Sequence, residues 1–182
     1  MNNWSKYKGY GVLLHISAIP SQYGIGDIGH SGFEFLKWLN EVGANTWQVL
    51  PTGLSDETNC PYACFSAFGG NPLFLCLESL KQNHLITSEL KKYPQQSIKS
   101  NRIDFDNIHK YKDPYLKEAY QTFSTKNLYQ EEYLNFKKES EHWLDDLTLF
   151  LVLTEKHGHN WKHWPNNLSQ YGSKEVEIFK KK

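Results

Sequence analysis

Residues 11–50 read GVLLHISAIPSQYGIGDIGHSGFEFLKWLNEVGANTWQVL, and this stretch decides the fold class. Gly11–Ile16 is a short, mostly continuous apolar run, which is typical of a strand buried on both faces. Ser31–Val42 carries apolar residues at helical spacing, and Gly43 follows where a left-handed glycine would end a helix. Thr46–Leu50 has the pattern of a second buried strand. Strand, helix and strand at this spacing predict one right-handed βαβ unit with parallel strands, and hence an α/β fold.

The remainder of the chain is predicted to be mainly helical. We expect a short strand over 73–77, two short helical pieces over 80–93, a polar loop over 95–112, a helix over 115–123 with Pro114 in its first turn, and one long amphipathic helix over 131–157. No internal repeat interrupts this pattern.

Composition limits the class of protein. Lys and Arg (20) balance Asp and Glu (20), so no excess positive charge is available to hold a phosphate backbone, and nucleic acid is not an expected partner. No apolar run is long enough for a membrane span and no signal peptide is recognisable, so the cytoplasm is expected. The three cysteines, Cys60, Cys64 and Cys76, are therefore expected to be reduced thiols. Aromatic residues make up 15% of the chain, which suits a glycan site but equally suits cores and interfaces.

A long loop follows the second predicted strand. Residues 47–72 read WQVLPTGLSDETNCPYACFSAFGGNP, which passes from a buried strand into a segment dense in aromatic, Gly and Pro residues. Residues 10–29, YGVLLHISAIPSQYGIGDIG, form a second dense segment just upstream. Together the two segments resemble the start of the 4-alpha-glucanotransferases, the amylomaltase or disproportionating-enzyme family (glycoside hydrolase family 77). The similarity covers LLH, YGIGD, WQ-x-LP, PY and SAF-x-GNP in the same order with similar gaps.

The resemblance implies a partial (β/α)8 barrel. Such a barrel alone needs about 250 residues, so this chain is expected to supply its first two strands. Residues 1–77 would be the start of the barrel with its substrate loop, and residues 78–182 a mainly helical inserted subdomain. The family's catalytic aspartate, glutamate and second aspartate belong to later strands, so no catalytic residue is assigned before Lys182. We therefore expect an N-terminal portion of such an enzyme that is inactive alone.

The resemblance also implies substrate-binding residues. Tyr62 matches a family tyrosine that packs against the sugar on the donor side of the cleaved bond, and Pro61 fixes the backbone that presents it. Cys60 stands where the family has the serine of S-P-Y. The alternative for Tyr62 is a core tyrosine beneath the loop. His15, on the first strand, is more often an interior histidine than a catalytic one.

The activity implied is transfer of α-1,4-glucan segments, from maltooligosaccharides, glycogen or starch, with retention. Because the nucleophile and the acid/base would both be carboxylates, no cofactor is expected. The expected partner is an α-1,4-glucan. Whether a second polypeptide completes the barrel is left open by the sequence. Two alternatives remain: a non-enzymatic glucan-binding module derived from the same fold, and an unrelated α/β domain.

Two other patterns in the sequence resemble known kinds of site. Gly24, Gly26 and Gly29 spell G-x-G-x-x-G, but the first glycine lies far from the end of the strand, so a sharply bent loop with positive φ is favoured over a dinucleotide site. The cysteines Cys60 and Cys64 could join His157, His159 and His163 in a zinc site, but C-x3-C lacks a matching second pair. No metal is expected.

Overall fold

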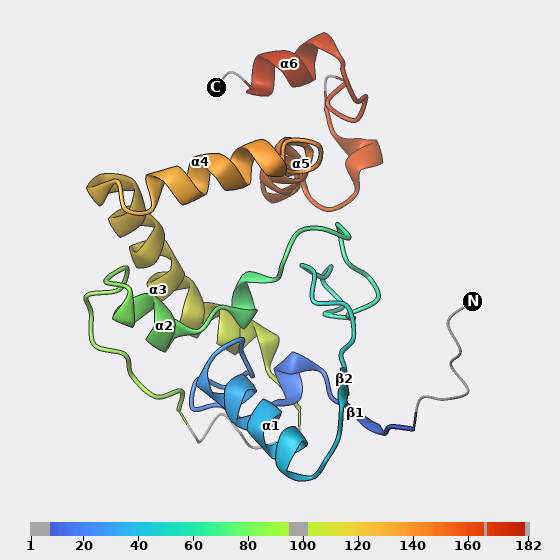
Figure 1. Ribbon diagram of the computed structural model, residues 1–182. Coiled ribbons are helices and arrows are strands. Elements are labelled where there is room, and N and C mark those ends of the chain that lie inside the picture. Colours follow the sequence, from blue (N-terminus) through green and yellow to red (C-terminus); the bar gives the residue numbers. More distant parts are fainter. Residues whose placement is uncertain (1–7, 95–101, 166, 181–182) are drawn as a thin grey trace. The chain divides into compact units, whose positions relative to one another are not determined.

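The computed structural model describes residues 8–94, 102–165 and 167–180 of the chain. The chain forms two compact units, Met1–Tyr129 and Gln130–Lys182. The first unit contains, in order, β1 (Gly11–Leu13), η2 (Ile16–Ala18), α1 (His30–Glu41), β2 (Thr46–Gln48), η3 (Pro72–Phe74), α2 (Leu77–Gln82) and α3 (Phe105–Lys126), where η marks a 3-10 helix (Figure 1). The second contains α4 (Gln130–Glu139), α5 (Leu144–His157), η5 (Trp161–His163) and α6 (Lys174–Lys180). The expected boundary after residue 77, between the start of the barrel and the inserted subdomain, stays a prediction.

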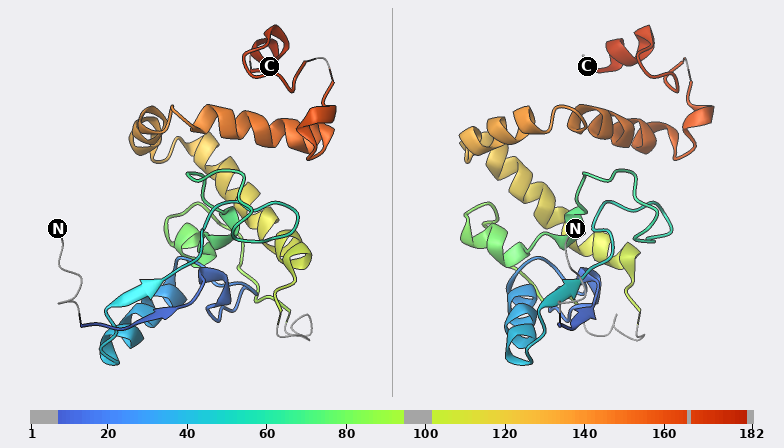
Figure 2. Two further views of the ribbon diagram at one scale, coloured as in Figure 1. Left: turned by 90° about the vertical axis from the view of Figure 1, so that its right-hand side faces the viewer. Right: turned by 45° about the vertical axis from the view of Figure 1, so that its right-hand side comes forward.

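The predicted βαβ unit with parallel strands is present. β1 and β2 pair in parallel, with Gly11 opposite Thr46 and Leu13 opposite Gln48, and α1 lies beside them (Figure 2). The ring of Phe35 on α1 meets the ring of Trp47 on β2 edge-on, with their centroids 5.0 Å apart. This contact fixes the helix against the two-stranded parallel sheet.

The strands are shorter and more exposed than the apolar runs predicted. β1 stops at Leu13 because Ile16 already begins a 3-10 helix, and Leu13 is 57% exposed. The expectation of burial on both faces is wrong for the described chain, since the outer two residues of each strand are exposed and the middle ones, Val12 and Trp47, are half-buried. Gly43 behaves as expected: its φ of +77° follows the end of α1.

The segment around residue 73 is not a strand. The Asn71 side chain accepts a hydrogen bond from the Leu73 backbone N–H at 2.9 Å, and Pro72 occupies the first helical position. Both features favour helix, so η3 and then α2 replace the expected strand. Of the two helical pieces expected over 80–93, only the end of α2 is helical.

The long helix α3 begins earlier than expected. Asp104 accepts a hydrogen bond from the Asn107 N–H at 3.1 Å and caps the helix, so residues from Phe105 onward are helical where a polar loop was predicted. Pro114 therefore lies inside α3 and not in its first turn. The part of that predicted loop at residues 95–101 lies outside the described residues.

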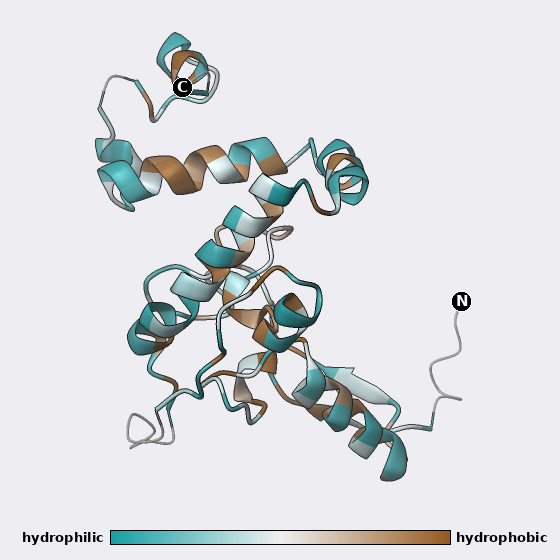
Figure 3. Ribbon diagram, turned by 90° about the vertical axis from the view of Figure 1, so that its left-hand side faces the viewer, coloured by the Kyte–Doolittle hydropathy of each residue, from teal (hydrophilic) through white to brown (hydrophobic). Residues whose placement is uncertain are grey.

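The predicted long helix over 131–157 is two helices. α4 ends at Glu139 and α5 starts at Leu144, and the turn between them is closed by a hydrogen bond from the Trp143 N–H to the Ser140 carbonyl at 3.1 Å. Trp143 has a φ of −144°, which lies outside the helical range and breaks the run. The middle of α5 is apolar, as its colouring shows (Figure 3).

The core of the first unit joins the loops after β1 and β2 to α3. One cluster contains Ile16, Ile25, Leu73, Phe74, Tyr93 and Ile108, and a second contains Tyr23, Leu77, Ile86 and Ala119. Because α3 contributes to both clusters, it serves as the common support for η3 and α2.

Candidate functional site

The loop that follows β2 is closed by its own backbone. We call residues 51–71 the site loop. Its two arms form antiparallel bridges at Gly53–Gly70 and Ser55–Cys64. The Asn71 N–H donates to the Thr52 carbonyl at 3.0 Å where the arms meet. The loop is therefore an ordered platform at the carboxyl end of a strand.

A hydrogen-bonded turn at the tip of the site loop presents Tyr62. Asp56 Oδ1 accepts from both the N–H (2.9 Å) and the hydroxyl (2.5 Å) of Thr58. Asn59 follows with a φ of +55°, a conformation that asparagine tolerates better than most residues. Beyond this turn the Tyr62 side chain is 75% exposed, so in the described chain it is not the core tyrosine that the alternative required.

A hollow of about 610 Å³ lies between the arms of the site loop. Its walls include Tyr62 and Phe68, which is 63% exposed, together with the polar side chains of Thr52 and Ser66. Aromatic rings beside hydroxyl groups offer an apolar face and polar contacts to one ligand.

The two cysteines of the site loop differ in position. Cys60 is exposed on the turn and does not line the hollow, whereas Cys64 lines it and donates its thiol to the Pro61 carbonyl at 3.0 Å. Sequence reasoning did not assign Cys64 or Phe68 to a substrate site. The sequence did contain one signal for Phe68: it is an aromatic residue directly before Gly69 and Gly70 in the loop.

The site loop rejoins the core at a buried lysine. Lys112 of α3 is fully buried, and its Nζ donates to the carbonyls of Leu73 at 2.6 Å and Leu75 at 2.8 Å. Burial lowers the pKa of this ammonium, and the carboxylate of Asp27 opposes that shift. Burial likewise raises the pKa of Asp27, which is 4% exposed, and Lys112 opposes that shift in turn. The two bonds from Lys112 hold η3, and with it the end of the site loop, against α3.

The glycine-rich segment before α1 serves close packing. Only Gly24 has a positive φ, +84°, so the expectation of positive φ holds there alone. A Cβ on Gly26 would lie 1.9 Å from the Ile16 carbonyl oxygen, and one on Gly29 would lie 2.3 Å from the sulfur of Cys76. Buried Asp27 lies between these glycines, where a nucleotide phosphate would need positive charge. The geometry is that of a packed turn.

Two features of the described residues bear on other functions. Within 8–94, 102–165 and 167–180, no three or more His, Cys, Asp or Glu side chains gather in a way that could hold a metal ion. No helix among the described residues combines the length and apolar character needed to cross a membrane.

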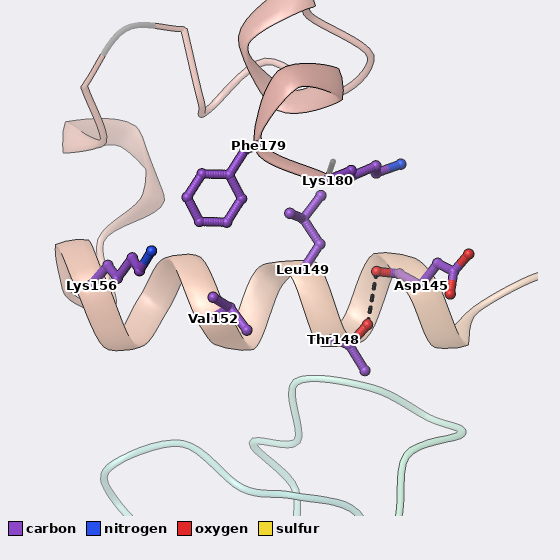
Figure 4. A pocket seen from close by; sticks show the side chains of 7 residues that line it. All are labelled: Asp145, Thr148, Leu149, Val152, Lys156, Phe179 and Lys180. Atoms are coloured by element: carbon purple, nitrogen blue, oxygen red, sulfur yellow. Dashed lines mark hydrogen bonds between the residues drawn. The ribbon is translucent and has the colours of Figure 1, made fainter. Parts of the chain in front are cut away.

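A second hollow, of about 520 Å³, lies within the second unit between α5 and α6 (Figure 4). Leu149 and Phe179 face one another across it, and the Lys156 ammonium lies 4.7 Å from the centre of the Phe179 ring. Among the described residues that line it, Asp145 is the one carboxylate. This arrangement offers apolar contact and does not contain the two carboxylates that glycoside chemistry requires.

Comparison with known proteins identifies the relatives of the chain. A family profile described as 4-alpha-glucanotransferase matches residues 14–182. The 4-alpha-glucanotransferase of Clostridium butyricum is 34% identical over 168 residues, which cover 92% of this chain and 34% of that protein. The enzyme of the same name from Thermus thermophilus is 35% identical over 159 residues, which cover 87% of this chain and 31% of that protein.

A solved structure is also similar. The amylomaltase from Streptococcus agalactiae, in complex with acarbose, matches with a TM-score of 0.82 over 97% of this chain and 36% of that one. At 22% identity, this likeness shows the fold. The chain spans about a third of the length of the relatives it matches.

Proposed function

The chain belongs to the 4-alpha-glucanotransferase family, and from that premise we propose that its site loop binds the donor sugar of an α-1,4-glucan. The observation that carries the proposal is the exposed ring of Tyr62, which together with Phe68 lines a hollow at the carboxyl end of β2. Aromatic faces pack against the C–H faces of sugars, and barrel active sites lie at the carboxyl ends of the strands.

The reaction follows from the same premise. β1 and β2 are the first two strands of a (β/α)8 barrel, and the carboxylates that act as nucleophile and acid/base lie outside residues 1–182. The whole enzyme cleaves an α-1,4 bond, holds the donor on a carboxylate, and passes it to the 4-hydroxyl of a second glucan with retention. The chain works in the cytoplasm, and its part in the reaction is to orient the donor. Tyr62 supplies the platform, and Cys60 lies on the turn that precedes it.

The first test is transfer by residues 1–182 alone. Incubation with maltotriose should yield neither glucose nor maltotetraose, because removal of one member of a concerted catalytic set already lowers kcat by orders of magnitude. Binding of maltotriose without transfer is the expected result. Transfer by the pure chain would refute the assignment of the carboxylates to other residues.

The second test places Tyr62 in a complete enzyme, made by joining residues 1–182 to the remainder of the Clostridium butyricum relative. Tyr62→Ala should lower kcat and kcat/KM by about tenfold or more, because a platform that orients the donor acts more strongly in the transition state than in the ground state. Tyr62→Phe should retain most of the activity if stacking dominates. Tyr120→Ala is the matched control, since Tyr120 is 70% exposed on α3. Parent-like constants for Tyr62→Ala would refute the proposed site.

A further inference from the structure

Phe68 is the second aromatic residue that lines the hollow, and it is carried by a turn of its own. Leu54 donates its N–H to the Gly69 carbonyl at 3.3 Å and accepts from the Phe65 N–H at 3.0 Å. The stretch between Phe65 and Gly69 is therefore pinned at both ends to one residue of the opposite arm. Within it, the Ser66 hydroxyl accepts from the N–H groups of Phe68 at 3.0 Å and Gly69 at 3.2 Å. These four bonds fix the backbone that presents Phe68.

The turn that carries Tyr62 is held by other bonds. The Asp56 N–H donates to the Ala63 carbonyl at 2.9 Å, and the Ala63 N–H donates to the Cys60 carbonyl at 2.9 Å. These bonds close the tip of the site loop around Tyr62 and share no residue with those that hold Phe68. The two aromatic residues therefore reach one hollow from two separately fixed turns.

Both aromatic side chains are accessible to a ligand. Tyr62 is 75% exposed and Phe68 is 63% exposed, and the hollow that they line has a volume of about 610 Å³. Pockets of about 300–1,000 Å³ hold ligands of drug size, which is the size of a maltose or maltotriose molecule. Such a hollow has room for more than one glucose unit.

Ser66 adds a polar group to the same wall. It lines the hollow, and its oxygen accepts from two backbone N–H groups. A hydroxyl that accepts in this way still has its own O–H to donate, and hydrogen bonds in a chain strengthen one another. Phe68 and Ser66 together thus offer an apolar ring and a hydroxyl donor, which are the two kinds of contact that a sugar makes.

We propose that Phe68 and Ser66 form a second sugar subsite of the site loop, which binds the glucose unit next to the one on Tyr62 in the same α-1,4-glucan. This subsite rests on the proposed function and makes Phe68 a residue that sets the preference for donor length. A ring packed on Phe68 contributes only when the glucan is long enough to reach it. Donors with a single glucose unit on the donor side of the cleaved bond lose this contact, and longer donors keep it.

The contact is tested on the chain itself by NMR. In protein with ¹³C-labelled phenylalanine, maltotriose should shift the ring signals of Phe68, which are assigned by their loss in Phe68→Ala. Phe33 is the matched reference, because it lies on α1 and is equally exposed at 63%. An unshifted Phe68 ring at the highest maltotriose concentration, or equal shifts of the two rings, would overturn the proposal.

The length preference is tested in the joined enzyme described above. The measured quantity is kcat/KM for maltotetraose divided by kcat/KM for maltose. Phe68→Ala should lower this ratio about five- to tenfold, the size of one aromatic contact, and Phe68→Tyr should recover most of it. Ser66→Ala should lower the ratio about two- to threefold, because the turn loses its internal acceptor, and Ser66→Thr should recover it. Phe33→Ala should leave the ratio unchanged, since any loss of stability affects both donors equally.

The outcomes separate this subsite from the proposed function. Equal losses for both donors in Phe68→Ala would overturn the subsite, because Phe68 would then act on the same glucose unit as Tyr62. An unchanged ratio in Phe68→Ala together with lower transfer in Tyr62→Ala would overturn the subsite and leave the proposed function standing. If Tyr62→Ala leaves transfer unchanged while Phe68→Ala lowers the ratio, the proposed function of Tyr62 fails and the length preference set by Phe68 stands.

Discussion

The longest helix of the first unit and the helices of the second unit are packed in different ways. α3 buries Ile108, Lys112 and Ala119 against segments far away in sequence, and the Lys112 bonds reach back to Leu73 and Leu75. α4 buries none of its residues, and α5 buries Leu153 and Thr154. The first unit is therefore organised by contacts between a helix and distant loops, while the second relies more on local helical bonds. Stability should accordingly be distributed unevenly between them.

The largest expected effect comes from Lys112. Lys112→Met removes the ammonium that bonds two carbonyls and leaves Asp27 buried without its opposite charge. Each buried carbonyl that loses its donor costs about 1–3 kcal/mol, so the loss of both bonds should cost about 2–6 kcal/mol. Hydrogen exchange should show the amides of the first unit losing protection while those of α5 keep theirs.

Lys110 supplies the matched control for Lys112. It is exposed on the same helix, so Lys110→Met should change stability by less than about 0.5 kcal/mol. Adding Asp27→Asn to Lys112→Met should recover part of the lost stability, since the double variant no longer buries a carboxylate without a positive charge to oppose it. Equal, small effects of Lys112→Met and Lys110→Met would show that the buried bonds contribute little.

A pair of leucines tests whether the two units unfold separately. Leu77 is 0% exposed in the first unit and Leu153 is 2% exposed in the second. Leu→Ala at either site should cost about 2–5 kcal/mol, because a cavity remains after truncation. Each variant should lower protection from hydrogen exchange in its own unit. Loss of protection in both units from either change would mean that they unfold as one.

The smallest expected effect is local and depends on pH. The Glu118 carboxylate of α3 accepts hydrogen bonds from the hydroxyl and N–H of Ser88 and from those of Thr87, and these bonds lower its pKa to about 2. A depressed carboxyl pKa means that the stabilisation is complete above the unfolded value near 4.5 and is lost as pH falls toward 2. The Ser88 amide resonance should titrate with an apparent pKa of about 2.

Glu118→Gln should abolish the titration of the Ser88 amide resonance. Glu89 is exposed and follows Ser88 in the sequence, so Glu89→Gln is the control and should leave that titration unchanged. A midpoint near 4.5 in the parent would mean that the hydrogen bonds do not form in solution. Because the carboxylate is solvent-accessible, global stability should change little in either variant.

The βαβ unit could be predicted because its signals are local. Apolar spacing within 31–42 and the glycine at position 43 define α1 without reference to the rest of the chain. The start of α3 could not be predicted from the sequence, because the stretch before residue 112 is polar in composition. A sequence pattern would assign a lysine such as Lys112 to the surface. Its burial depends on two carbonyls that lie 39 and 37 residues away in the sequence.

The position of Tyr62 on a loop also has a local signal, whereas its role as a sugar platform stays a prediction. Tyr62 could be placed on a loop from Pro61 and the surrounding glycines. The second aromatic wall, Phe68, depends on the pairing of Gly53 with Gly70, which no local pattern reveals.

The closure of the site loop also makes it exchangeable. The arms meet at the bond between Asn71 and Thr52, so residues 53–70 form a nearly closed ring on a fixed base. Doubling the length of such a ring adds only about 0.6 kcal/mol of closure entropy. Loops of other lengths could therefore be grafted between the same two anchors, and the reach of the aromatic platform altered, without redesign of the strand that carries it.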